Sequence, residues 1–270
     1  LALAMERGYF KDEGVEVESV PGLVGSRQVP AIGAGQLDMS GGSLSLSILN
    51  AISRDVPLKL VGSMGYYKDK NTSATWLVRR TDLKDKFPTL QAVKGAKIGL
   101  IAPNSIPEYC VAGSFQRVGV DWKQAVDPQI LDFPSMVIAL ANKQIDLAIL
   151  GEPFVTQAEA KGVAERWMAA PEMLGRPIEW TILIAGPSLY KKTDAAVRWF
   201  KAYIRGLRDY ETAFITKTDP ALRKQAMDVL NRITHNQDPT LYEKTTFWLA
   251  GPDEPADSIL DKASLTDQLG

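Results

Sequence analysis

Short apolar runs alternate with helical patterns along most of the chain. Runs rich in apolar and β-branched residues predict strands at 15–20, 58–63, 75–79, 97–101, 129–133, 146–150, 166–169 and 181–185. Apolar residues at helical spacing predict helices at 27–35, 43–53, 107–118, 134–143 and 153–161. The 43–53 stretch also alternates like a strand, but Leu44, Ile48 and Ile52 recur at i+4 and favour a helix. This order is typical of an α/β protein with a parallel sheet.

The pattern changes after residue 187, where no further strand is predicted. Val197, Phe200 and Ile204 share one face of a long amphipathic helix expected at 194–216. A second helix is expected at 219–234, with Pro220 in its first turn. The last 20 residues are rich in Asp, Pro and Ser and predict short surface turns.

One segment of the chain is repeated in outline. Residues 31–39 (AIGAGQLDM) resemble residues 139–147 (ALANKQIDL), and both predict a helix end, a Gln-[Leu/Ile]-Asp turn and an apolar strand. Each strand then runs into a glycine turn, at Gly41-Gly42-Ser43 and at Gly151-Glu152-Pro153. The repeat predicts two similar α/β units. Ligands of open α/β sheets lie beyond the carboxyl ends of the strands, so both glycine turns are expected at a ligand cleft.

Composition narrows the possible functions. The 270 residues carry a formal net charge of −1, which argues against a nucleic-acid partner. No apolar run approaches the roughly 20 residues that span a bilayer. Cys110 and His235 are the only cysteine and the only histidine. One of each excludes an intrachain disulfide, a cysteine-based zinc site and most triad chemistry. We therefore expect a binding protein without catalytic residues, metal or cofactor.

The opening of the chain resembles a known family. It contains Leu3-Ala4-Met5-Glu6-Arg7-Gly8-Tyr9-Phe10-Lys11-Asp12-Glu13-Gly14-Val15. This is similar to the start of the nitrate/sulfonate/taurine-type solute-binding proteins of bacterial ABC importers, which are related to the thiamine-precursor-binding group. The turn at Gly25-Ser26 and the segments 34–38, 95–99 and 151–153 continue the similarity in the same order, over roughly residues 1–215.

The resemblance implies a type II periplasmic-binding-protein fold, with two α/β lobes joined by two crossovers. Lobe I would comprise 1–86 and 182–270, and lobe II 87–181. The implied partners are a small-molecule ligand, held in the interlobe cleft by hinge closure, and a membrane permease. The implied protein is a monomer, either periplasmic or lipid-anchored outside the cytoplasm. Residues 1–4 continue a helix without an initiator Met, so we expect a secretion signal and a first strand upstream.

Three turns that precede helices are candidate ligand contacts, because helix N-termini offer free N–H groups and a favourable dipole to anions. They are Gly25-Ser26-Arg27, Gly41-Gly42-Ser43 and Asn104-Ser105. Ser105 and Glu108 match a capping box, which would occupy the Ser105 hydroxyl locally. Three such corners favour a small organic acid or a sulfonate as the ligand. Each turn can equally be an ordinary helix start, and Arg27 fits a helix surface better than a ligand contact.

Four larger side chains are candidates for ligand specificity. Tyr66 and Tyr67 follow a predicted strand on the cleft side, and Trp180 lies near the return crossover. Glu152 could accept hydrogen bonds from an amine or cap the following helix, and Trp180 could pack a hinge. Glu152 with the tyrosines would favour a cationic or neutral heteroaromatic ligand. Cys110 is expected to be a buried small side chain inside a helix.

Two other functions use similar folds. Pyrimidine synthases of the yeast type consume an active-site histidine, whereas His235 lies in the C-terminal helical region. The effector domain of a LysR-type regulator would require an upstream helix-turn-helix. The Gly-Tyr-Phe opening favours the transporter family over both.

Overall fold

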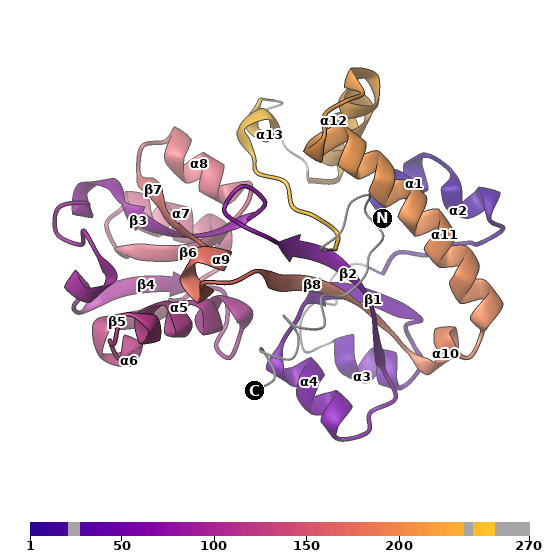
Figure 1. Cartoon of the computed structure of the whole chain (residues 1–270), viewed down its shortest axis with the longest axis horizontal. Coiled ribbons are helices and arrows are strands. Elements are labelled where there is room, and N and C mark those ends of the chain that lie inside the picture. Colours follow the sequence, from indigo (N-terminus) through magenta and orange to yellow (C-terminus); the bar gives the residue numbers. More distant parts are fainter. Residues whose placement is uncertain (21–27, 235–239, 252–270) are drawn as a thin grey trace. The chain divides into compact units, whose positions relative to one another are not determined.

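The computed structural model of the protein describes residues 1–20, 28–234 and 240–251. The chain divides into two compact units (Figure 1). Unit 1 comprises Leu1–Tyr66, Glu179–Pro239 and Trp248–Gly270, and unit 2 comprises Tyr67–Ile178 and Thr240–Phe247. The sequence-based lobes, 1–86 with 182–270 and 87–181, have different boundaries from these units and stay a prediction. The predicted C-terminal turns and His235 lie outside the described residues.

Unit 1 contains a three-stranded sheet in the order β1-β8-β2, with β1 antiparallel to β8. Its strands are β1 (Met39–Ser43), β2 (Lys59–Tyr67) and β8 (Ile178–Ala185). Its helices are α1 (Ala2–Glu6), α2 (Tyr9–Asp12), α3 (Gln28–Gly33), α4 (Leu46–Ser53), α10 (Pro187–Tyr190), α11 (Thr193–Tyr210) and α12 (Pro220–Thr234). Helix α11 continues into a π-helical turn, Glu211–Ile215, which confirms the long helix expected at 194–216.

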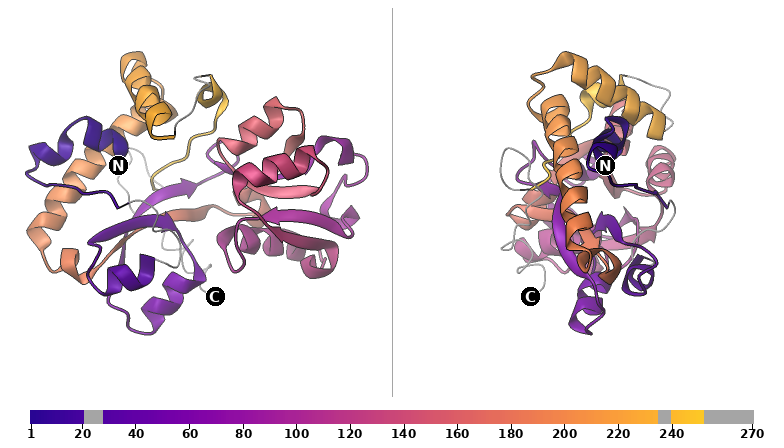
Figure 2. Two further views of the ribbon diagram at one scale, coloured as in Figure 1. Left: turned by 180° about the vertical axis from the view of Figure 1, so that it is seen from behind. Right: turned by 90° about the vertical axis from the view of Figure 1, so that its right-hand side faces the viewer.

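The Gly-Tyr-Phe motif fixes the first helices of unit 1 onto α11, beside which they lie in Figure 2. Gly8 separates α1 from α2 with a φ of 74°, a left-handed conformation that glycine adopts without strain. The Tyr9 hydroxyl donates to the Asp209 carboxylate. The Phe10 ring lies 5.6 Å from the Trp199 ring. The motif therefore has a structural role in this chain.

A glycine on α11 allows α1 to approach closely. A Cβ added at Gly206 would lie 2.5 Å from the Ala4 Cβ and 3.0 Å from the Ala4 Cα. We expect Gly206→Ala to lower the free energy of unfolding by about 1–2 kcal/mol, because this overpacking outweighs the better helix propensity of alanine. Urea unfolding measures the change. Lys201→Ala, on the exposed face of the same helix, should change it by less than about 0.5 kcal/mol, and equal effects would contradict the prediction.

Unit 2 contains a five-stranded sheet in the order β5-β4-β6-β3-β7. Its strands are β3 (Thr75–Arg80), β4 (Ala96–Leu100), β5 (Val126–Ile130), β6 (Leu147–Gly151) and β7 (Ala164–Ala169). Its helices are α5 (Ile106–Arg117), α6 (Trp122–Ala125), α7 (Phe133–Ala141), α8 (Phe154–Ala160), α9 (Ala170–Leu174) and α13 (Leu241–Lys244), with 3-10 turns at Thr81–Leu83 and Leu90–Ala92.

The unit 2 sheet is mixed, so the expected all-parallel sheet is wrong. Strand β4 is parallel to β5 and β6, but β3 is antiparallel to both of its neighbours, β6 and β7. Strand β3 enters the sheet directly from β2 without a crossover helix, so nothing requires it to run parallel. The α/β class itself is confirmed.

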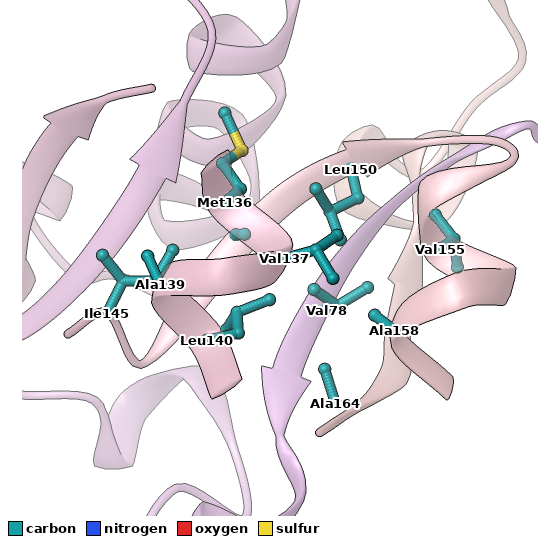
Figure 3. Close-up of a cluster of buried hydrophobic side chains, with 11 residues drawn as sticks. Val78, Met136, Val137, Ala139, Leu140, Ile145, Leu150, Val155, Ala158 and Ala164 are labelled. Atoms are coloured by element: carbon teal, nitrogen blue, oxygen red, sulfur yellow. The ribbon is translucent and has the colours of Figure 1, made fainter. Parts of the chain in front are cut away.

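One buried apolar cluster of unit 2 lies between the sheet and helices α7 and α8. Met136, Val137 and Leu140 of α7 are buried there (Figure 3). Val155 and Ala158 of α8 belong to the same cluster, together with Val78, Ala139, Ile145, Ala148, Leu150 and Ala164. This cluster fixes the start of α8, which immediately follows Gly151-Glu152-Pro153.

The repeated segment forms the same helix end in both units. The N–H groups of Gln36 and Leu37 donate to the Ala31 carbonyl, and those of Gln144 and Ile145 donate to the Ala139 carbonyl. Gly35 and Lys143 hold the equivalent left-handed position, with φ of 73° and 58°. A strand follows each turn, β1 in unit 1 and β6 in unit 2. The internal similarity is therefore confirmed as a shared helix-to-strand connection.

Two predicted strands are wrong in detail. Residues 15–20 form no strand, and Val15 and Val17 pack, partly buried, against the unit 1 cluster that contains Phe10 and Tyr203. The strand expected at 129–133 is β5, which begins at Val126 and includes Pro128. Proline discourages a strand prediction, but it is tolerated here because β5 lies at the edge of the sheet.

Candidate functional site

Four helices of unit 2 begin at one edge of its sheet. Strands β4, β5 and β6 are parallel, and β7 runs the same way because both β6 and β7 are antiparallel to β3. The carboxyl ends of these four strands therefore share an edge, which we call the carboxyl edge. They lead into α5, α7, α8 and α9. The predicted contacts Asn104, Ser105 and Glu152 all lie there, where ligands of open α/β sheets bind.

The start of α5 differs from the predicted capping box. The helix begins at Ile106 with Pro107 in its first turn, as expected. However, the Ser105 hydroxyl donates back to the Ala102 carbonyl at 2.7 Å and does not cap the helix. The Glu108 carboxylate accepts the Asn104 N–H instead. Asn104 has a φ of 54°, a left-handed conformation. With this turn, the N–H of Asn104, and not the N–H of Ser105, donates to the Glu108 carboxylate.

At each of the four helix starts at the carboxyl edge, a carboxylate of the chain accepts a backbone N–H, from inside the helix at α7 and α8 and from a residue just before it at α5 and α9. The Glu108 carboxylate accepts the Asn104 N–H at α5, and the Asp132 carboxylate accepts the Ser135 N–H at α7 at 2.8 Å. The Glu152 carboxylate accepts the Thr156 N–H at α8 at 3.2 Å, and the Glu172 carboxylate accepts the Ala169 N–H at α9 at 2.8 Å. Hydrogen bonds from the Ser135 side chain and backbone lower the pKa of the Asp132 carboxyl.

Glu152 belongs to a buried ion-pair cluster, with 1% of its side chain exposed. Its carboxylate lies 2.6 Å from the Arg166 guanidinium and accepts the Thr156 hydroxyl at 2.8 Å and the Thr246 N–H at 3.3 Å. The Arg166 guanidinium also pairs with Glu159 at 3.1 Å and lies 5.4 Å from the centre of the Trp76 ring. These contacts already balance the charge of Glu152 and attach the segment Thr240–Phe247 to unit 2.

Sequence reasoning missed Arg166 and Trp76. Arg166 lies in β7, 14 residues from Glu152, and Trp76 lies in β3. Their neighbours along the chain give no sign that they meet, because the contact depends on the pairing of β3 with β7. The acidic residue in Gly151-Glu152-Pro153 was the one feature of the sequence that pointed to this cluster.

Tyr66 and Tyr67 end β2 and belong to different units. Tyr66 is buried in unit 1, where its N–H donates to the Leu249 carbonyl at 2.8 Å. Tyr67 is buried in unit 2, and its hydroxyl lies 3.2 Å from the Thr75 hydroxyl. Burial raises the pKa of the Tyr67 phenol, so it stays protonated and can donate a hydrogen bond.

Gly41, Gly42 and Ser43 form part of strand β1 and do not form the predicted turn. They pair with Leu183, Ile182 and Thr181 of β8. A Cβ added at Gly41 would lie 2.3 Å from the Met64 sulfur, and one at Gly42 would lie 3.4 Å from the Gln28 amide nitrogen. Because the two glycines lack a Cβ, the side chains of Met64 and Gln28 can pack directly against the backbone of β1. The following helix, α4, begins only at Leu46.

The predicted contacts Gly25, Ser26 and Arg27 lie outside the described residues. The structure resumes at Gln28, whose side chain contacts strand β1. Gln28 begins α3 and is buried, and its side-chain oxygen accepts the Ser40 hydroxyl at 2.6 Å. Trp180 lies in β8 and is also buried, with its carbonyl accepting the Leu44 N–H. The side chain of Gln28 thus joins α3 to β1 next to Gly42.

A second buried carboxylate lies in unit 1. Glu179 of β8 accepts a hydrogen bond from the Ser63 hydroxyl of β2 at 2.6 Å, and neither residue is exposed. The pair links the two strands through which the chain passes from one unit to the other. Sequence reasoning missed both residues, because each lies inside a run of apolar strand residues.

The described residues show no arrangement for metal or thiol chemistry. Among them, no three His, Cys, Asp or Glu side chains gather as metal ligands. In the same part of the chain, none of the helices is both long and apolar enough to cross a membrane. Cys110 is fully buried in α5, as expected, and burial raises the pKa of its thiol.

We expect Cys110 to resist modification in the folded protein. A raised pKa keeps the group as a thiol at neutral pH, and the thiolate is the reactive form. Titration with a thiol-specific chromogenic reagent should show less than one-tenth of a thiol per chain reacting without denaturant, and one thiol per chain after unfolding in urea. Rapid reaction of the native protein would contradict the burial of this side chain.

Comparison with known proteins identifies this architecture as the type II periplasmic-binding-protein fold. The alkanesulfonate-binding protein SsuA from Xanthomonas axonopodis pv. citri, solved with bound MOPS, is 16% identical with a TM-score of 0.71, over 98% of this chain and 84% of that chain. The periplasmic aliphatic sulphonate-binding protein SsuA from Escherichia coli is 15% identical with a TM-score of 0.71, over 91% and 79% of the two chains.

The family follows from the sequence. The model of the NMT1/THI5-like family matches residues 1–210, and the chain belongs to this family. The periplasmic nitrate-binding protein NrtA from Synechocystis is 13% identical with a TM-score of 0.59, over 85% of this chain and 61% of that chain. No significant match is found among the curated proteins.

Proposed function

We propose that this chain is the solute-binding component of an ABC importer. It captures a small organic ligand, a sulfonate, a carboxylate or a heteroaromatic, and presents it to a membrane permease. The observation that carries the proposal is the family match over residues 1–210, supported by a fold shared with sulfonate-binding proteins. The protein acts as a monomer outside the cytoplasm, periplasmic or lipid-anchored, and has no catalysis or cofactor of its own.

The proposed ligand contacts come from both units. They are Gly25, Ser26, Arg27, Gly41, Gly42, Ser43, Tyr66 and Trp180 in unit 1, and Tyr67, Asn104, Ser105 and Glu152 in unit 2. Within this set, Glu152 acts by positioning, since its carboxylate is engaged by Arg166, Thr156 and Thr246. The Tyr67 phenol supplies a donor that does not ionise near neutral pH.

Capture proceeds by hinge closure in this proposal. The chain passes between the units inside β2, at Tyr66 and Tyr67, and inside β8, at Ile178 and Glu179. A ligand favours the closed form only by binding it more tightly than the open form. Small-angle scattering should show a smaller radius of gyration with saturating ligand, and an unchanged radius with a tight ligand would reject closure.

A thermal-shift screen tests the binding function itself. The panel contains alkanesulfonates, nitrate, small carboxylates and nitrogen heterocycles. A ligand at 100 times its Kd should stabilise the protein by about 2.7 kcal/mol and raise its Tm. Reconstitution with the cognate permease in vesicles should then make uptake of that ligand depend on this protein. A panel without any stabilising ligand would contradict the proposal.

A further inference from the structure

Within the described residues, the chain passes between the two units a third time, at Phe247 and Trp248. Residues 240–249, which we call the C-terminal clasp, belong to unit 2 up to Phe247 and to unit 1 from Trp248. The other two passages lie inside strands β2 and β8, whereas this one lies outside the named strands and helices. Each end of the C-terminal clasp is held by its own unit, so these attachments bear on how freely the units can move.

The unit 2 end of the C-terminal clasp is held by buried side chains and by Glu152. Leu241 and Tyr242 of α13 are buried, and α13 lies against α8. The Thr246 N–H donates to the Glu152 carboxylate at 3.3 Å. That carboxylate is itself fixed by the Arg166 guanidinium of β7. Two separate contacts therefore attach this end to unit 2.

The unit 1 end is fixed through both the backbone and the side chain of Trp248. The Tyr210 hydroxyl donates to the Trp248 carbonyl at 2.9 Å and accepts the Trp248 N–H at 3.2 Å. The Trp248 indole N–H donates to the Met64 carbonyl of β2 at 3.0 Å. The next residue, Leu249, accepts the Tyr66 N–H at 2.8 Å in an antiparallel bridge. The C-terminal clasp thus pairs with β2 at the residue where β2 leaves unit 1.

The C-terminal clasp has almost no slack between these attachments. Only Phe247 separates Thr246, which is held by unit 2, from Trp248, which is held by unit 1. Two residue steps span at most about 7 Å when fully extended. Thr245, just before them, is already extended, with a φ of −71° and a ψ of 137°. A larger separation of the two attachments therefore requires one of these hydrogen bonds to break.

We propose that the C-terminal clasp is a third hinge element that limits how far the two units move apart. Tyr210 is the positioning residue that holds it on unit 1. The value of this restraint for binding rests on the proposed hinge closure, but it does not depend on which ligand is bound. A restraint that narrows the open ensemble reduces the conformational entropy lost when the units close. Releasing the C-terminal clasp therefore broadens the ensemble of the ligand-free protein.

Tyr210→Phe releases the unit 1 end with little change in packing, because it keeps the ring that lies 6.4 Å from the Trp248 ring. Hydrogen exchange of the Trp248 and Tyr66 N–H groups should become about fivefold faster, as expected for the loss of one neutral hydrogen bond. Tyr9→Phe is the matched control, because the Tyr9 hydroxyl donates to Asp209 of the same helix α11 and not to the C-terminal clasp. Exchange of both N–H groups should stay unchanged in this control. Unchanged exchange in Tyr210→Phe would overturn the role of Tyr210.

The distance between the units is the readout that a purely local role of Tyr210 would not change. Lys201 in unit 1 and Lys161 in unit 2 are exposed, so Lys201→Cys and Lys161→Cys can carry spin labels, whereas Cys110 is buried. Electron–electron double resonance on the ligand-free full chain should give a broader distance distribution with Tyr210→Phe and an unchanged one with Tyr9→Phe. An unchanged distribution together with faster exchange in Tyr210→Phe would overturn the proposal.

Thr246→Pro tests the other attachment. Proline removes the N–H that donates to Glu152, and the extended conformation of Thr245 accommodates a proline after it. This variant should broaden the same distance distribution, because it releases the unit 2 end. If release of neither end broadens the distribution, the C-terminal clasp does not restrain the hinge.

These outcomes are separate from those that test the binding function. The distances are measured without ligand, so a C-terminal clasp without effect leaves the solute-binding proposal intact. A thermal-shift panel without any stabilising ligand would remove that proposal and leave the distance measurements unaffected.

Discussion

Glu152→Gln is expected to lower the free energy of unfolding by about 2–4 kcal/mol. The substitution keeps the shape of the side chain but leaves the Arg166 guanidinium with Glu159 as its only anionic partner among the described residues. Breaking a buried ion pair by removing one partner costs roughly 3–5 kcal/mol. The Arg166 side chain is 24% exposed, and water compensates part of that loss.

The measurement is urea unfolding followed by tryptophan fluorescence, since Trp76 lies beside Arg166. The matched control is Glu159→Gln. Glu159 pairs with the same guanidinium, but its side chain is 35% exposed, so its loss should cost less than about 1 kcal/mol. Hydrogen exchange of the Thr246 N–H, which donates to Glu152, should also become faster in Glu152→Gln alone. Equal losses from the two variants would show that burial does not distinguish these carboxylates.

Leu140→Ala is expected to cost a similar amount, about 2–5 kcal/mol, through a different mechanism. Leu140 is 1% exposed and packs in the cluster between α7, α8 and the unit 2 sheet (Figure 3). Truncating it removes buried apolar surface and leaves a cavity that the tightly packed surroundings fill only in part. The free energy lost should appear as a lower urea midpoint with an unchanged slope.

Helix α7 offers the control for that experiment. Ile138 lies two residues away on the same helix, and 59% of it is exposed. Ile138→Ala should change the free energy of unfolding by less than about 0.5 kcal/mol, because little surface leaves the interior. If Ile138→Ala destabilised the protein as much as Leu140→Ala, the assignment of the buried face of α7 would be wrong.

Local features of the sequence predicted most helices and strands. The repeated Gln-[Leu/Ile]-Asp segment ends α3 and α7 by the same hydrogen bonds, because these depend on backbone geometry within a few residues. Pro107 and Pro220 mark the first turns of their helices for the same reason. The segment 43–53 fits both a strand and a helix, and it is divided: Ser43 ends β1, whereas residues 46–53 form α4.

The candidate site was less predictable, since its important contacts join distant parts of the chain. Glu152 was singled out as a possible ligand contact, but the sequence gives no sign that Arg166 and Thr246 meet it. Gly41 and Gly42 resemble a turn when considered alone. Only their pairing with β8, and the side chains of Met64 and Gln28 against them, explains why they are glycines in a strand.

The sequence by itself therefore determined the α/β class, the family and most of the helix starts, with that of α4 as an exception. Those features depend on local propensity and on residues that lie next to one another. The tertiary structure decided that β3 runs antiparallel and that a carboxylate accepts a backbone N–H at or just before each helix start on the carboxyl edge of unit 2. Strand direction depends on pairing between distant segments. An acid near a helix start can cap it or face a ligand, and only the folded backbone decides between the two.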